Sequence, residues 1–185
     1  MKAFTYYHPC DGFPRVEQQP RVDAWGRNWK AAGFETVVLS LNDVRRSQHW
    51  FAMQSALAGV ARKSLSDLGR ARIQRWVALE ATLKGKPGVS LMTDYDVGNV
   101  GFTPADVAPS GTVFYDAGHI PCAVSTDAPG ALALVQYLLV SVQRYAKESL
   151  MEDTFLFQHA RTKFATRDVV REGPGKEAKL LHLPK

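Results

Sequence analysis

The chain has 185 residues, of which 45% are hydrophobic and 22% are charged, a balance typical of a globular protein with one sizeable core. Its two cysteines are too few for a disulfide framework or a cysteine-based zinc site. The net charge of +5 favours an anionic partner such as a nucleotide, a phosphorylated substrate or nucleic acid, although scattered basic residues also serve solubility alone.

The sequence shows no sign of a membrane segment. No apolar run reaches the roughly 20 residues needed to cross a bilayer. The first residues also lack the apolar centre of a signal peptide. We therefore expect no membrane span and a cytoplasmic location.

The first forty residues predict a strand, a helix and a second strand. Residues 2–7 contain aromatic strand formers, and residues 35–41 are β-branched. Between them, residues 20–32 repeat apolar side chains at helical spacing, with Pro20 suited to the first turn. This order is the opening of an α/β domain with a parallel sheet.

Further helices and strands follow along the whole chain. We predict helices over residues 48–60, 66–83 and 128–145 and a short one from residue 151. Strands are expected near residues 89–93, 112–116, 122–126 and 178–184. The prediction is a small single domain over residues 1–185, with a mixed, mostly parallel central sheet flanked by helices. Its core should hold Trp25, Trp29, Trp50 and Trp76.

Two aspartates one residue apart, Asp94 and Asp96, follow the strand near residue 90. Side chains alternate along a strand, so both carboxylates face the same side if the extended chain continues to Asp96, and Tyr95 then points away toward packing. Two negative charges at such a short distance favour a divalent cation between them. The alternative is a polar turn that closes a hairpin.

An arginine-bearing helix precedes this pair, with Arg72 and Arg75, and a late Glu152-Asp153-Thr154 and a terminal Leu180-Leu181-His182 follow it. With the strand-helix-strand opening, this order resembles small nucleotide-sugar glycosyltransferases of the GT-A type. The resemblance implies a GT-A-like, Rossmann-like nucleotide-binding fold. It also implies Mn²⁺ or Mg²⁺ as cofactor, a UDP- or GDP-sugar as donor, and an acceptor that is a glycan, a small molecule or nucleic acid.

By the same resemblance, Asp96 binds the metal, Asp94 serves the metal or the ribose, and His182 completes the metal shell. Arg72 and Arg75 reach the diphosphate or pair with Asp94, since guanidinium groups suit both partners. Asp153 acts on the acceptor hydroxyl as a base or orients it. The alternatives are a solvated face for the arginines, a helix-dipole charge for Asp153 and simple packing for His182.

Further candidates are expected at the ends of the strands, where parallel sheets bind ligands. Tyr6 and His8 are placed to stack on a nucleobase, or to pack in the core. Asp43 is placed to contact the base or ribose. Asp116 and His119 are candidates for the acceptor side, and Asn99 for a turn.

Two other functions fit the same residues. One is a metal-dependent nuclease or phosphodiesterase, with Asp94 and Asp96 on Mg²⁺ and the basic surface on DNA. The other is a non-catalytic nucleotide-binding module of the same fold.

Overall fold

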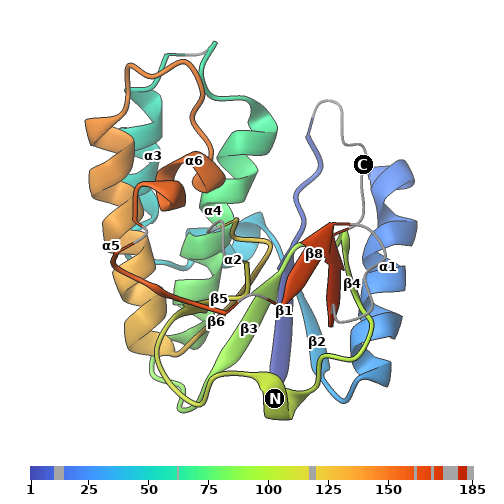
Figure 1. Ribbon diagram of the computed structural model, residues 1–185. Helices are drawn as coiled ribbons and strands as arrows, with labels where there is room; N and C mark the ends of the chain where they lie inside the picture. The colour runs from blue at the N-terminus through green and yellow to red at the C-terminus, as the bar shows by residue number, and fades with distance from the viewer. Residues whose placement is uncertain are drawn as a thin grey trace.

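A mixed six-stranded sheet with helices on both faces forms the centre of the structure (Figure 1). The computed structural model describes residues 1–10, 15–61, 63–116, 120–160, 162–167, 169–172 and 179–182. The strand order is β2-β1-β3-β6-β5-β7, and β6 runs against the other five. The predicted α/β fold with a mostly parallel sheet is confirmed. The six strands are β1 (Lys2–Tyr6), β2 (Glu35–Leu39), β3 (Ser90–Thr93), β5 (Val113–Phe114), β6 (Ala123–Thr126) and β7 (Ala165–Thr166).

Helices cover the two faces of the sheet unequally. In the view of Figure 1, α3, α4, α5 and α6 lie to the left of the sheet and α1 lies to the right. No helix in the described ranges is both long and apolar enough to cross a membrane. The helices are α1 (Arg15–Ala31), α2 (Leu41–Arg45), α3 (Trp50–Ala58), α4 (Asp67–Leu83), α5 (Ala128–Arg144) and α6 (Asp153–Gln158), with a 3₁₀ turn η1 at Pro104–Asp106.

A second, three-stranded sheet lies on the α1 side. Its order is β4-β9-β8, built from β4 (Val97–Asn99), β9 (Leu180–His182) and β8 (Val170–Glu172). β4 pairs with β9 in antiparallel register, with Val97 opposite His182. The end of the described chain is thereby joined to the residues that directly follow Asp96.

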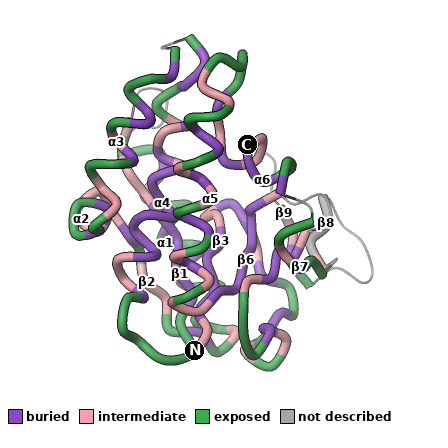
Figure 2. The backbone as a smooth tube through the Cα atoms, turned by 90° about the vertical axis from the view of Figure 1, so that its left-hand side faces the viewer, coloured by how far each residue is buried: buried purple, intermediate pink, exposed green. Residues whose placement is uncertain are grey.

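Side chains that alternate along the strands of the large sheet pack into two separate cores. On β1, Phe4 belongs to the core beneath α2–α6, whereas Ala3 belongs to the core beneath α1. On β3, Met92 and Leu91 divide in the same way. Figure 2 accordingly shows buried residues along the central strands and α4. The core positions predicted for Trp25, Trp29 and Trp76 are confirmed, and Trp50 packs partly buried against the first core.

Three elements differ from the sequence-based prediction. Helix α1 begins at Arg15, so Pro20 lies inside the helix and does not open it. Residues after β2 form the short helix α2, because the side chains of Ser40 and Asp43 cap its first turn reciprocally. Asn99, expected in a turn, ends strand β4, and its buried amide oxygen accepts hydrogen bonds from the backbone N–H groups of Gly101 and Phe102.

Helix α4 is closely approached by the segment that precedes α6. The hydroxyl of Ser66 caps the helix by accepting from the N–H of Gly69 at 3.0 Å. A Cβ on Gly69 would lie 2.7 Å from the carbonyl oxygen of Met151. The missing side chain therefore lets this segment reach α4.

Two glycine-to-alanine substitutions test this contact. Gly69→Ala should lower the free energy of unfolding by about 1–3 kcal/mol, because the new methyl group must displace backbone. Gly26→Ala, inside α1 with its nearest neighbour at 3.9 Å, should raise it by up to about 1 kcal/mol through helix propensity. Urea denaturation of both variants measures the difference, and equal effects would contradict the close approach.

Candidate functional site

The candidate site lies at the carboxyl ends of β1 and β3. β1 has β2 on one side and β3 on the other, so the chain changes direction across the sheet between β1 and β3. Open α/β sheets bind ligands at such a switch point, in the crevice beyond the strand ends. A narrow cleft of about 50 Å³ occupies this place. Its lining comes from β1 and the residues after it, from α4, and from the turn after β3: Tyr6, Tyr7, His8, Cys10, Leu68, Ala71, Arg72, Arg75, Asp94, Tyr95 and Asp96.

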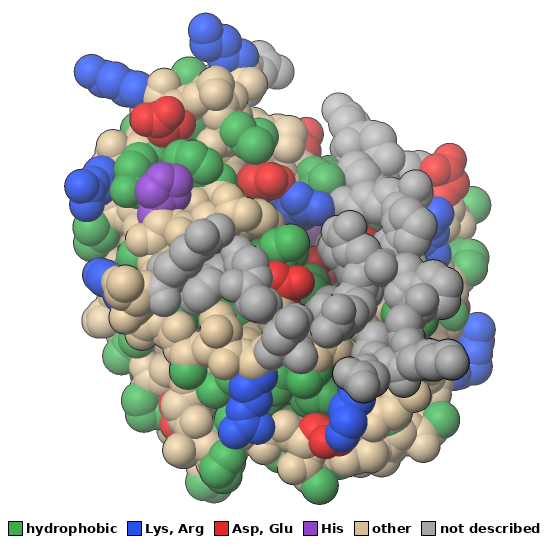
Figure 3. All heavy atoms as spheres, viewed as in Figure 1, with side chains coloured by type: hydrophobic (Ala, Val, Ile, Leu, Met, Phe, Trp, Pro, Cys, Tyr) green, Lys and Arg blue, Asp and Glu red, His purple; other side chains and the backbone are tan. Residues whose placement is uncertain are grey.

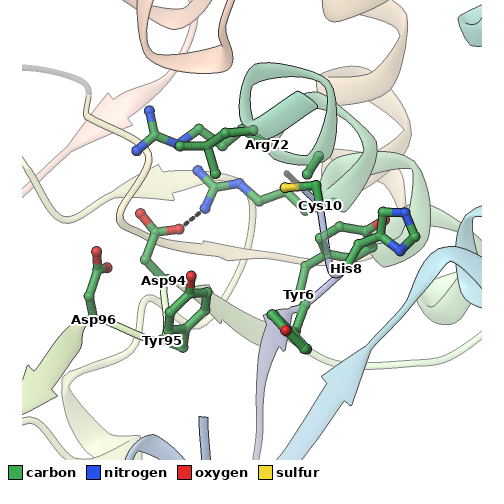
Figure 4. A pocket seen from close by; sticks show the side chains of 11 residues that line it. Tyr6, His8, Cys10, Arg72, Asp94, Tyr95 and Asp96 are labelled. Carbon is green, nitrogen blue, oxygen red and sulfur yellow. Dashed lines mark hydrogen bonds and ion pairs between the residues drawn. The ribbon is translucent and has the colours of Figure 1, made fainter. Parts of the chain in front are cut away.

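A turn brings the two aspartates together. β3 ends at Thr93, and the N–H of Val97 donates to the carbonyl oxygen of Asp94 at 3.1 Å. The extended chain therefore stops before Asp96, contrary to the premise of strand alternation. Both carboxyl groups still face Arg72 (Figure 4). Because the chain turns, Tyr95 also lines the cleft, where its ring meets that of Tyr7 edge-on at 6.1 Å, although it was expected to point away.

The guanidinium group of Arg75 joins three parts of the chain. It forms an ion pair with Asp94, donates to the carbonyl oxygen of Pro121 at 2.8 Å, and contacts Asp153 Oδ2 through Nε at 2.9 Å and Nη2 at 2.7 Å. Its side chain is 5% exposed. An arginine this deep is stabilised by its partners, because an unpaired buried charge is very costly. The pairing of Arg75 with Asp94 is one of the two roles that the sequence suggested.

Asp153 lies behind Arg75 and away from the cleft lining. Its side chain is fully buried, and Oδ2 also accepts from Trp76 Nε1 at 2.9 Å. A carboxylate in this position does not reach an acceptor hydroxyl in the cleft. The geometry supports a positioning role, in which Asp153 holds Arg75 and Arg75 holds Asp94, in place of the predicted base.

Arg72 lies one turn before Arg75 and pairs with Glu152, the neighbour of Asp153. Both side chains of this pair are about a quarter exposed, at 26% and 23%, and Arg72 lines the cleft. Two consecutive acids thus bind two arginines on one face of α4. The more exposed of the two arginines faces the space in which a ligand would lie.

The residues present suit a cation that binds together with a phosphate. Asp96 is 8% exposed and lines the cleft beside Asp94. No group of three or more acidic, histidine or cysteine side chains with metal-site geometry occurs among the described residues. Mg²⁺ typically takes one or two carboxylates and completes its shell with water and substrate phosphates. The backbone of His182 lies opposite Val97, one residue after Asp96, and its side chain is outside the described part.

Tyr6 and His8 both line the cleft, as the sequence placed them. Tyr6 is only 7% exposed, and its hydroxyl has no hydrogen-bond partner within the described ranges. Burial, with the nearby Asp43 and Cys10, raises the pKa of Tyr6 well above its ordinary value, so the group stays a neutral donor. Its ring packs in the core, and its hydroxyl is itself buried.

Other predicted residues lie outside the cleft lining. Asp43 Oδ2 accepts from the N–H and hydroxyl of Ser40, and its other oxygen pairs with Arg46, so it serves the cap of α2. Asp116 lies near the thiol of Cys122, where burial foremost and then this carboxylate raise the pKa of that thiol to about 12. His119 lies outside the described residues.

Several cleft residues were not predicted. Tyr7 and Cys10 come directly after β1, and Leu68 and Ala71 lie one turn before Arg72 and Arg75 on α4. The rule that ligands bind beyond the ends of parallel strands would have found the first two. Helical spacing of four residues would have found the others.

Two larger hollows adjoin the cleft. One, of about 340 Å³, shares Tyr7 and lies beside the ends of β1 and β2. The other, of about 440 Å³, shares Tyr95 and Asp96 and lies beside α1. Both volumes fall in the range of small-molecule sites, whereas the cleft itself has room for an ion and a few ligand atoms.

Comparison of the chain with protein-family models and with curated proteins finds no match.

Two arginine substitutions one helical turn apart test the buried ion pairs. Arg75→Met leaves Asp153 without its cation and should lower the free energy of unfolding by about 3–5 kcal/mol. Arg72→Met removes a partly exposed pair and should cost about 0–1 kcal/mol. Urea denaturation gives both values. The double variant Arg75→Met/Asp153→Leu should recover part of the loss, because an apolar pair can replace a buried ionic one. Similar costs for both single variants would refute this role of Arg75.

Proposed function

We propose that the protein is a metal-dependent glycosyltransferase of GT-A-like fold that uses a nucleotide-sugar donor. The observation that carries the proposal is the position of Asp94 and Asp96. They stand side by side at the switch point of a mostly parallel sheet, facing the arginines of α4. A nucleoside diphosphate bound with a divalent cation is the ligand that this arrangement suits best.

The acids that line the cleft support a cation. Arg75 pairs with Asp94 and Asp153, and Arg72 pairs with Glu152. Asp94 and Asp96 both line the cleft, and carboxylate oxygens are the ligands that Mg²⁺ and Mn²⁺ prefer.

The side chains around the cleft have separate tasks in this proposal. Asp96 holds the Mn²⁺ or Mg²⁺ ion, and Asp94, oriented by Arg75, supports it or contacts the ribose. Arg72 donates hydrogen bonds to diphosphate oxygens. The hollow beside Tyr7 is large enough for the nucleobase of UDP or GDP.

The transfer breaks the bond between the sugar's anomeric carbon and the diphosphate oxygen and forms one to an acceptor oxygen, whose proton is released. The bound ion supplies Lewis-acid stabilisation of the departing diphosphate. Arg72 adds a positive charge beside the same leaving group. The buried network Asp153–Arg75–Asp94 keeps Asp94 oriented as charge develops.

The surface gives less support to nucleic acid as substrate. On the face drawn in Figure 3, the described Lys and Arg side chains are scattered, most of them near the rim, and form no continuous stripe. Grooves that bind nucleic acid gather such charges along the backbone's path.

Nucleotide binding tests the proposal through Asp96→Asn. With Mn²⁺ and saturating UDP or GDP, wild-type protein should melt several degrees higher, since ligand at 100 times Kd adds about 2.7 kcal/mol. Asp96→Asn should lose most of that shift, because the amide cannot supply the charge that the ion requires. Differential scanning fluorimetry measures the midpoints.

Asp23→Asn, an exposed acid on α1 bonded to Gln19, is the matched control and should keep the full shift. The proposal fails if no diphosphate among UDP, GDP, CDP and ADP raises the melting midpoint with Mn²⁺ or Mg²⁺. It also fails if Asp96→Asn responds like wild-type protein.

A further inference from the structure

The hollow beside α1 lies across the turn from the narrow cleft. Residues 21–28 of α1 form one wall, and the turn after β3 with the start of β4 forms the other. The lining residues are Arg21, Ala24, Trp25, Asn28, Tyr95, Asp96, Val97 and Gly98. Tyr95 and Asp96 line both spaces, so the motif separates a cleft on the α4 side from a hollow of about 440 Å³ on the α1 side. That volume suits a compound built on one or two rings.

Hydrogen bonds between α1 and the strands hold the hollow open. Trp25 Nε1 donates to the hydroxyl of Thr93 at 2.8 Å. Asn28 Nδ2 donates to the carbonyl oxygen of Asn99 at 2.9 Å, and the N–H of Asn99 donates to Asn28 Oδ1 at 2.6 Å. These groups are satisfied within the protein, so the walls are preformed and need no ligand to order them.

The other polar residues of the lining are Arg21, Tyr95 and Asp96. Arg21 forms no ion pair with any carboxylate of the described residues. Burial foremost, and then Asp96 and Tyr7, raises the pKa of Tyr95, and Arg21 acts in the opposite direction. A cation on Asp96 would offset the acidic charge in this wall. The hollow would then present a net positive charge, with a guanidinium suited to phosphate or carboxylate.

We propose that this hollow is the acceptor site and that it takes a hydroxylated ring compound carrying an anionic group, a phosphate or a carboxylate, which Arg21 binds. The proposal rests on the proposed function, because it places the acceptor hydroxyl next to Asp96, across the turn from the donor's diphosphate. Tyr95 offers the compound the edge or face of a half-buried ring, and Trp25 forms the apolar floor. Binding of the ion and of the anionic compound should be mutually favourable, since each reduces the charge that opposes the other.

Three sugars of similar shape test the charge requirement. Saturation-transfer NMR titrations with glucose 6-phosphate, glucuronate and glucose, in the presence of Mg²⁺, should show at least tenfold tighter binding of the two anions. Arg21→Gln should weaken the anions about tenfold, toward the affinity of glucose, because it removes a charge-assisted contact. Arg27→Gln removes an exposed cation of the same helix outside the hollow and should leave the affinities of both anionic sugars unchanged.

The outcomes separate this inference from the proposed function. A UDP titration on the same samples should leave the anionic sugars bound, and their displacement by UDP would assign the hollow to the donor and overturn the acceptor role. Suppose that UDP binds with Mg²⁺, but the Kd of both anionic sugars exceeds about 1 mM or is the same for Arg21→Gln as for wild-type protein. The acceptor site is then refuted, and the glycosyltransferase proposal is unaffected. If the anions bind through Arg21 but no nucleotide binds, the hollow stands as an anion site and the glycosyltransferase proposal falls.

Discussion

The ion pairs of Arg75 are the interaction on which the rest of the site depends. One buried guanidinium links α6 through Asp153, the turn after β3 through Asp94, and the chain before β6 through Pro121. These segments are far apart in the sequence, and the turn after β3 and the chain before β6 are also joined by a hydrogen bond from the N–H of Asp94 to the carbonyl oxygen of Cys122. A low-dielectric environment makes such a network strong when it is complete and costly when one member is lost. The orientation of Asp94 is therefore set from inside the protein.

The position of the motif on the sheet determines what that network can serve. Arg75 and its partners lie on the α4 side of the strand ends, and the hollow with Arg21 lies on the α1 side. Asp96 is common to both spaces. A group transfer needs two substrates that meet at one point, and a carboxylate shared by two adjoining spaces provides such a point. The small sheet of β4, β9 and β8 fixes the exit of the turn by pairing Val97 with His182.

Local sequence signals predicted much of the fold. The cap at Ser66, the β-branched run near Val37 and the helical spacing of residues 128–144 each act over a few residues, and each element forms as expected. Strands β4, β7 and β8 are only two or three residues long, and β4 and β7 pair with strands far along the chain. Such pairing leaves no periodicity that a local pattern can detect.

The sequence likewise predicted some residues of the site and missed the arrangement of others. Asp94, Asp96, Arg72 and Arg75 were found because strand ends and helix faces follow simple rules, and the structure brings them together. The burial of Asp153 behind Arg75 was not foreseen, since it depends on how closely the segment at Met151 approaches Gly69. Asp43, expected at the base or ribose, caps helix α2 and lies outside the cleft lining, a role that a strand-end acid can equally well take.

The central claim is that Asp96 holds a divalent cation together with a diphosphate in this cleft. Electron paramagnetic resonance of Mn²⁺ tests it directly, because phosphorus nuclei in the inner shell couple to the metal. The account predicts one tightly bound Mn²⁺ per chain when UDP or GDP is present, with phosphorus coupling, and loss of that signal in Asp96→Asn. Free Mn²⁺ in all samples, or bound Mn²⁺ without phosphorus coupling that survives Asp96→Asn, would contradict it.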